Sequence, residues 1–202
     1  MSNIIGFEAV NSEHNVFRIG GKSLLPADIE WPVNPEGKKL TFILNIPTSF
    51  LNDVLCYKYP ENKIISVFTT YSKKEYFLDT IGYHGDSEEL KNIKEGFTKV
   101  ILHDVGIPRN DADYLIPAQR LVVGVESDST SEDIGSLLGG KPILLQNENL
   151  EIDSYQFCMQ LYGSDFPEEF EDIFYLSDSI GYLFLNKDGN TDDIGIFFTQ
   201  CT

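Results

Sequence analysis

Residues 17–26, FRIGGKSLLP, have the composition of the second half of a phosphate-binding loop, an apolar run followed by Gly-Gly-Lys-Ser. Such a loop needs a glycine five residues before Gly21, and that position holds Val16, whose β-branched side chain resists the turn. The loop must also open a helix, which Pro26 and Pro32 disfavour here. The sequence therefore predicts a structural turn at the double glycine and no nucleotide site.

The three histidines, His14, His84 and His103, offer no metal-ligand spacing. His103 precedes Asp104 near the end of an apolar run, and adjacent strand residues point to opposite faces unless the strand ends there. A structural role for His103 is the favoured interpretation, and a site residue is the alternative. We expect no metal and no cofactor.

The three cysteines, Cys56, Cys158 and Cys201, are odd in number and widely separated, which is typical of reduced thiols in a cytoplasmic protein. No serine lies in a GxSxG nucleophile elbow. A structural thiol is favoured over a nucleophile at Cys158, which lies in an apolar run. No residue is assigned a catalytic role, which favours a non-enzymatic protein and leaves an enzyme as the alternative.

The charge balance is strongly acidic, with 32 Asp and Glu against 15 Lys and Arg and a formal net charge of −17. Such a surface repels phosphate backbones and anionic membranes, which disfavours binding to nucleic acid or to a membrane. It attracts basic proteins, and solubility alone is the alternative explanation of the charge. The apolar runs are too short to cross a bilayer, and no signal peptide precedes the first strand candidate.

Short runs rich in β-branched and aromatic residues predict strands at many places in the chain. They are residues 3–10, 40–46, 64–71, 99–105, 120–127, 154–162, 181–186 and 194–201. The Asp-Gly turn between the last two predicts a C-terminal hairpin, which we favour over a calcium loop in residues 186–193. Capping and periodicity predict short helices at 49–57, 90–95, 133–138 and 168–174.

A second Gly-Gly-Lys occurs at residues 139–141, and in both places a strand, a short helix and an aromatic strand follow. This order indicates an internal duplication. We therefore expect one domain over residues 1–202 with an α+β fold. It would contain similar halves at about 17–78 and 138–202, joined by residues 79–137.

The order of Gly20-Gly21-Lys22, Leu25-Pro26, Glu30-Trp31-Pro32 and Gly37 before the strand LTFILNI resembles the YwqG-like family, a bacterial family of unassigned function. Its second half is matched by Gly139-Gly140-Lys141-Pro142, Gln146, Gln160, Asp178, Gly181 and Gln200-Cys201. Asn45 departs from the family's usual Gln, and Lys63 from its usual Gly. The resemblance implies an α+β fold with two similar halves and no established reaction.

Five residues are candidates for a cleft or binding site: Trp31, Gln146, Gln160, Asp178 and Gln200. Trp31 between polar residues and prolines is either core or an exposed anchor for a partner. The polar candidates either satisfy loop backbone groups or line a cleft between the halves.

Three functional hypotheses follow from these patterns. The first is a non-enzymatic interaction protein, in its most specific form an immunity-type binder of a basic partner, because acidic surfaces steer cationic proteins. The alternative is a small-ligand binder or enzyme that uses the cleft between the halves. The third is a structural or regulatory protein whose partners no motif encodes.

Overall fold

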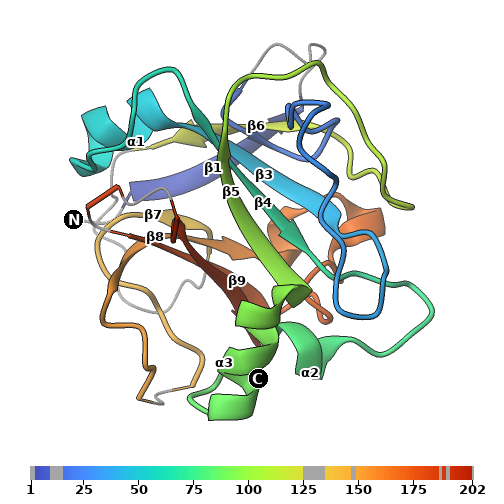
Figure 1. Ribbon diagram of the computed structural model, residues 1–202. Coiled ribbons are helices and arrows are strands. Elements are labelled where there is room, and N and C mark those ends of the chain that lie inside the picture. Colours follow the sequence, from blue (N-terminus) through green and yellow to red (C-terminus); the bar gives the residue numbers. More distant parts are fainter. Residues whose placement is uncertain are drawn as a thin grey trace.

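The computed structural model describes residues 3–9, 16–124, 135–146, 149–186, 188–189 and 192–201. Its strands form one sheet of ten strands in the order β10-β9-β8-β7-β1-β6-β2-β3-β4-β5, and each neighbouring pair is antiparallel (Figure 1). The strands are β1 (Asn3–Ala9), β2 (Arg18–Ile19), β3 (Thr41–Pro47), β4 (Ile64–Thr69), β5 (Thr98–His103), β6 (Gln119–Val123), β7 (Leu137–Leu138), β8 (Tyr155–Tyr162), β9 (Ile180–Asn186) and β10 (Gly195–Gln200).

The helices of the described residues are short. They are α1 (Thr48–Leu55), α2 (Leu78–Ile81), α3 (Ser87–Asn92), the π-helical turn η1 (Ile93–Phe97) and the 3₁₀ turns η2 (Gly163–Asp165) and η3 (Glu168–Phe170). The sheet curls until its first and last strands, β10 and β5, contact each other, which gives a nearly closed antiparallel barrel.

The expectation of an α+β fold with two similar halves is wrong. The ten strands form one continuous β-rich sheet, in which β1 and β6 are central strands, and no division into duplicated halves is shown. The helix expected at 168–174 is reduced to the single turn η3. Its apolar side chains Phe170, Ile173 and Phe174 instead fill the main core, because burying them there removes more apolar surface from water than one helix face would.

All eight predicted strands are confirmed, with ends that differ by a few residues. The sequence missed β2 and β7, which are two residues long and lie directly before the two double glycines. The C-terminal hairpin is confirmed as β9 and β10, although Lys187, Asn190 and Thr191 of its turn lie outside the described residues.

Two of the expected helices form. Asp86 caps α3 by accepting a hydrogen bond from the Glu88 amide at 2.7 Å, and Gly96, with φ 112°, ends the turn that follows. Helix α1 begins at Thr48, whose hydroxyl donates to the Pro60 carbonyl and does not cap the helix. The helix expected at 133–138 is wrong over its described part: residues 133 and 134 lie outside the described residues, residues 135 and 136 are not helical, and the last two residues form β7.

The core has three parts. The largest fills the inside of the barrel and includes Leu44, Val67, Met159, Leu183 and Phe197. A second cluster covers the outside of β8–β10, and a third, around residues 25–42, packs outside β3 and β4. Residues on both faces of these strands are thus buried, which explains why their sequences are nearly continuous apolar runs.

Both double glycines adopt positive φ, as expected for structural turns. Gly20 and Gly21 have φ values of 58° and 69°, and Gly139 and Gly140 have 67° and 72°. A Cβ at Gly20 would lie 2.6 Å from the Pro117 carbonyl oxygen, so the chain needs glycine here for conformation and for space.

Substitution of Gly20 by alanine tests this. Gly20→Ala is expected to lower the free energy of unfolding by roughly 2–4 kcal/mol, because left-handed strain adds to the clash with backbone. Gly37 also has positive φ, at 80°, but nothing lies within 4 Å of its Cβ position, so Gly37→Ala is the matched control, with an expected loss of about 1 kcal/mol. Equal losses for the two variants in urea unfolding would show that close approach at Gly20 contributes nothing.

Candidate functional site

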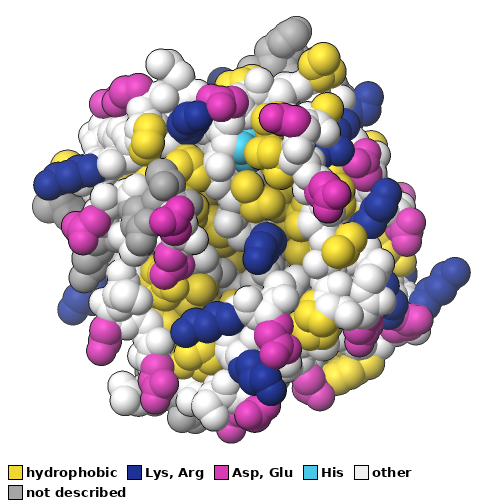
Figure 2. Space-filling view, viewed as in Figure 1, with side chains coloured by type: hydrophobic (Ala, Val, Ile, Leu, Met, Phe, Trp, Pro, Cys, Tyr) yellow, Lys and Arg dark blue, Asp and Glu magenta, His cyan; other side chains and the backbone are white. Residues whose placement is uncertain are grey.

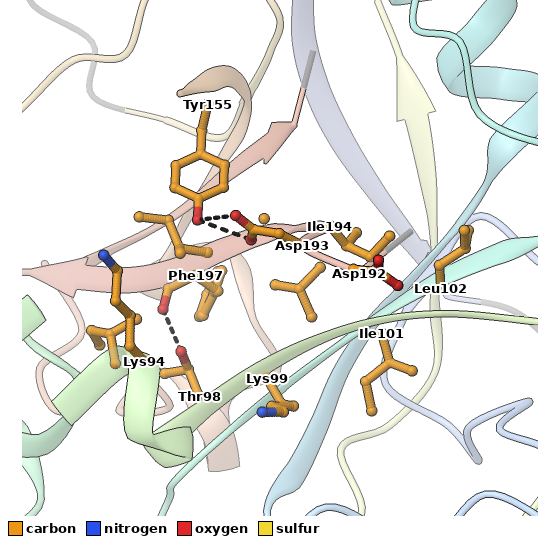
Figure 3. Close-up of a pocket in the computed structure, with 14 residues that line it drawn as sticks. Lys94, Thr98, Lys99, Ile101, Leu102, Tyr155, Asp192, Asp193, Ile194 and Phe197 are labelled. Carbon is orange, nitrogen blue, oxygen red and sulfur yellow. Dashed lines mark hydrogen bonds between the residues drawn. The ribbon is translucent and has the colours of Figure 1, made fainter. Parts of the chain in front are cut away.

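The two edge strands of the sheet border a groove of about 690 Å³, which we call the seam groove. Its lining comes from residues 93–94 on η1, residues 98–102 on β5 and residues 192–197 at the start of β10, together with Tyr155. β5 and the C-terminal strands stand on its two sides (Figure 1), and the lining side chains are drawn in Figure 3.

The floor of the seam groove is apolar. Val100 and Leu102 from β5 are partly buried against the barrel core, to which Ile194 and Phe197 also belong. Hydrophobic atoms are visible in the middle of this face of the molecule, with charged side chains around them (Figure 2). A concave site with an apolar floor and a few polar groups is the usual form of a binding site.

The rim of the seam groove carries both signs of charge. Lys94 and Lys99 are exposed on the η1 and β5 side, and Asp192 and Asp193 are exposed on the β10 side. The Tyr155 hydroxyl donates to Asp193, with both carboxylate oxygens at 2.9 Å (Figure 3). Burial, with a smaller contribution from the Asp193 carboxylate, raises the pKa of Tyr155 to about 12, so this hydroxyl remains a neutral donor.

A hydrogen bond joins the two edges directly within the lining of the seam groove. The Thr98 hydroxyl donates to the Phe197 carbonyl at 2.5 Å (Figure 3). Next along β10, the carbonyl of Thr199 accepts a hydrogen bond from the Tyr83 amide at 3.1 Å. Beyond β5 in the other direction, Val105 and Ile107 are 60% and 84% exposed, so apolar surface continues past the end of the strand.

The candidate glutamines lie away from the groove and hold a loop. Gln160 is fully buried, and its side chain accepts from the Ile143 amide at 2.9 Å and donates to the Gly135 carbonyl at 2.8 Å. Gln200 is also fully buried and accepts from the Leu145 amide at 3.2 Å. Both therefore satisfy backbone groups of the segment that covers the outside of β8–β10.

Gln146 and Asp178 lie near the end of β10. Gln146 donates to the Cys201 carbonyl at 3.1 Å, and its own amide lies 3.4 Å from the side-chain oxygen of Gln200. Asp178 is exposed, and its negative charge adds to burial in raising the pKa of the Cys201 thiol. The structure thus brings Gln146, Gln160 and Gln200 around one loop, where they are occupied by structural hydrogen bonds.

Trp31 lies apart from the other candidates, in the cluster outside β3 and β4. It is 7% exposed, its ring nitrogen donates to the Leu40 carbonyl at 2.9 Å, and its ring packs edge-on against Phe68 at 5.2 Å. The Arg109 guanidinium lies 5.5 Å from the Trp31 ring. Trp31 is therefore a core residue in this fold.

His103 and Ser66 form a buried pair that the sequence did not predict. The Ser66 hydroxyl lies 2.6 Å from His103 Nε2 and 2.6 Å from Asn45 Oδ1, and His103 Nδ1 donates to the Asp104 backbone carbonyl. A hydroxyl this close to an imidazole has the geometry of an activated nucleophile. Ser66 is fully buried and His103 is 3% exposed, so the pair serves the packing of β3, β4 and β5.

The other reactive groups are also structural or unclustered. The cysteines are free thiols, Cys158 and Cys201 buried and Cys56 exposed, and burial raises the pKa of the Cys158 thiol. Within the described residues, no group of three or more His, Cys, Asp or Glu side chains is placed to hold a metal ion. His14 lies outside the described residues, and His84 bonds Glu89 at 3.0 Å.

No residue of the seam groove was a candidate from the sequence. The groove exists because β5 and β10, which are far apart in the chain, become the two edges of one curled sheet. No local sequence pattern specifies the order in which the strands pair. The local sequence signals for the groove were the apolar run of β5, with Val105 and Ile107 after it, and the acidic pair Asp192 and Asp193 before the last strand.

The fold and the groove define an antiparallel, barrel-like β protein, in which the described residues form no strand pairing between β5 and β10. The chain belongs to a family described as a domain of unknown function, DUF1963, whose model matches residues 17–161. The match includes the β5 side of the seam and ends before β9 and β10. No match was found among curated proteins. In the part of the chain that the structure describes, no helix has the length and apolar character needed to cross a membrane.

The role of Gln160 as a loop clamp can be tested by Gln160→Leu. This change leaves the Ile143 amide and the Gly135 carbonyl without their partner, so the free energy of unfolding should fall by roughly 1–3 kcal/mol. Gln146→Leu removes one side-chain hydrogen bond at a half-buried position and should cost less. The measurement is urea unfolding, and a larger loss for Gln146→Leu would contradict the assignment.

The buried imidazole of His103 predicts a pH dependence of stability. Burial outweighs the Asp104 carbonyl and lowers the pKa of His103 below its unfolded value of about 6.5, so the folded state binds fewer protons. The resulting stability is present above about pH 6.5 and is lost as the pH falls below it. The difference in free energy of unfolding between the natural protein and His103→Gln should therefore shrink from pH 7.5 to pH 5.5. Parallel curves would show that His103 does not titrate in this way.

Proposed function

We propose that this protein is a non-enzymatic interaction module that binds a basic partner protein, in the manner of an immunity-type binder, with the seam groove as its docking site. The observation that supports this most is the groove itself, with its apolar floor and its charged rim between two edge strands. In the part of the chain that the structure describes, no strand pairs with the outer edge of β5 or of β10, and such edges are ready templates for association with another chain.

The overall charge supports a basic partner. A net charge of −17 on 202 residues attracts cationic proteins over several ångströms and speeds their association, with strong dependence on salt. Asp192 and Asp193 bring that charge to the edge of the groove. Apolar contact at the floor would then supply affinity, and the acidic surface would supply steering.

The alternative function is a small-ligand binder or an enzyme. The volume of the seam groove, about 690 Å³, falls within the range of roughly 300–1,000 Å³ that is usual for small-molecule sites. The Tyr155 hydroxyl and the lysines of the rim would supply its polar contacts. The cleft first considered, around Gln146, Gln160 and Gln200, is not the basis of this alternative, because those side chains hold the loop.

Within the DUF1963 family we propose a YwqG-like member from a bacterium, because the glycine turns, the Trp-Pro pair and the closing Gln-Cys occur in the family's order. We also propose a cytoplasmic location. Its support is the presence of three free thiols, which is typical of a reducing compartment.

The proposal predicts that partner capture depends on the two aspartates of the rim, Asp192 and Asp193. The natural protein, immobilised in lysate at low salt, should retain a basic protein at near-equal stoichiometry and lose it at high salt. The double substitution Asp192→Asn with Asp193→Asn should weaken that retention at least tenfold, while asparagine keeps an acceptor for Tyr155. Bound proteins are identified by mass spectrometry, and affinities are then measured with the purified partner.

The matched control removes the same charge elsewhere. Glu168 and Glu169 are exposed on η3, so Glu168→Gln with Glu169→Gln leaves the same net charge as the rim variant. The control should retain the partner nearly as well as the natural protein. Equal weakening by the two variants would mean that net charge, and not the seam groove, governs binding, and would overturn the docking site.

A further inference from the structure

We propose that the partner binds in the seam groove by strand addition, as an extended segment that forms main-chain hydrogen bonds with the edge of β5 beyond the point where Thr98 ties it to β10. This inference rests on the proposed function and specifies how the partner is bound. Its basis is that, among the described residues, no backbone ladder joins β5 to β10, although both line one groove.

The register identifies the peptide groups of β5 that face the seam. The Thr70 amide donates to the Phe97 carbonyl, and hydrogen-bonded pairs alternate along an antiparallel ladder. Lys99, Ile101 and His103 are therefore bonded to β4. The peptide groups of the intervening residues, Thr98, Val100 and Leu102, point into the seam.

The same reasoning applies to β10. The Asn186 amide donates to the Ile194 carbonyl, so Ile196, Phe198 and Gln200 bond to β9. Gly195, Phe197 and Thr199 face the other way, which agrees with the hydrogen bonds that Phe197 and Thr199 accept from Thr98 and Tyr83. The Gly195 peptide groups and the Phe197 amide remain directed at the seam groove.

An added strand would present its side chains alternately to the core and to the solvent. Inward side chains would meet Val100, Leu102, Ile194 and Phe197, so alternate residues of the partner segment should be apolar. The neighbouring strands alternate in direction throughout the sheet, so β5 and β10 run in opposite directions.

The charged residues at the rim of the groove determine which charges the outward side chains of the added strand should carry. Asp192 and Asp193 lie at the start of β10 and would pair with a basic residue, while Lys94 and Lys99 would pair with an acidic one. The occupant is therefore an extended segment with alternating apolar residues, a cationic residue at one end and a carboxylate at the other. It belongs to a protein whose overall charge is basic, as the surface charge requires.

The probe is a nine-residue peptide of alternating valine and threonine with lysine at one end and glutamate at the other, together with the peptide of reversed order. The matched control peptides are N-methylated at every second residue, which removes main-chain donors and preserves charge and side chains. Fluorescence anisotropy measures affinity, and amide hydrogen exchange by NMR locates the contact. In the free protein, the amides of Val100 and Leu102 should exchange at least tenfold faster than those of Lys99 and Ile101.

Strand addition predicts that one peptide order binds, that it protects the Val100 and Leu102 amides, and that N-methylation weakens it at least tenfold. Equal binding of methylated and unmethylated peptides would overturn strand addition and leave docking in the groove intact. Failure of both orders would overturn strand addition as well. Neither failure affects the test of the proposed function, which depends on the rim aspartates and a captured protein.

Discussion

The hydrogen bond from the Thr98 hydroxyl to the Phe197 carbonyl is the point at which the two edges of the sheet are tied. A sheet of ten strands that curls this far either closes with a ladder or must protect its edges. Here the edges meet at that tie, and the Tyr83 amide covers the next free carbonyl on β10. The remaining edge groups border a groove, so the fold leaves an opening where a closed barrel would have none.

Each strand at the seam is held by its own neighbours in the chain and in the sheet. β10 begins at Gly195, where a Cβ would lie 2.2 Å from the Phe184 carbonyl oxygen, and the exposed acidic pair stands directly before it. On the other side, residues 93–97 leave α3 through a π-helical turn and deliver the chain into β5. The aromatic core inside the barrel supports both strands, because Val100, Leu102 and Phe197 pack into it. The groove is thus a consequence of how the edges are held.

Local patterns in the sequence predicted the strands well, because β3, β4, β8 and β9 are buried on both faces and read as apolar runs. The glycine turns were also predicted, since Val16 and the prolines excluded a phosphate loop. The fold class was predicted wrongly. The same order of elements follows each of the two double glycines, and this suggested two similar halves that the continuous sheet does not have. Which strands become edges depends on long-range pairing, so the seam groove was beyond the reach of local patterns.

The same dependence on long-range contacts explains why the selected candidate side chains are structural and do not line the seam groove. Gln160 and Gln200 were selected as polar residues in apolar strands, and they are indeed inside the protein, but they hold the covering loop by backbone hydrogen bonds. Trp31 was selected as an aromatic residue among polar ones, and its ring is enclosed by Phe68 and Arg109. A polar residue within an apolar strand pattern indicates a side chain that will be buried and will need a hydrogen-bond partner. For these glutamines the partner is the backbone of the covering loop.

An open seam can be tested by NMR detection of scalar couplings across hydrogen bonds in the free protein. We expect such couplings along β4–β5 and β9–β10, and none between the Val100 and Leu102 peptide groups and those of Gly195 and Phe197. A continuous series of couplings from β5 to β10 would show a closed barrel with no free edge, and would overturn the open seam.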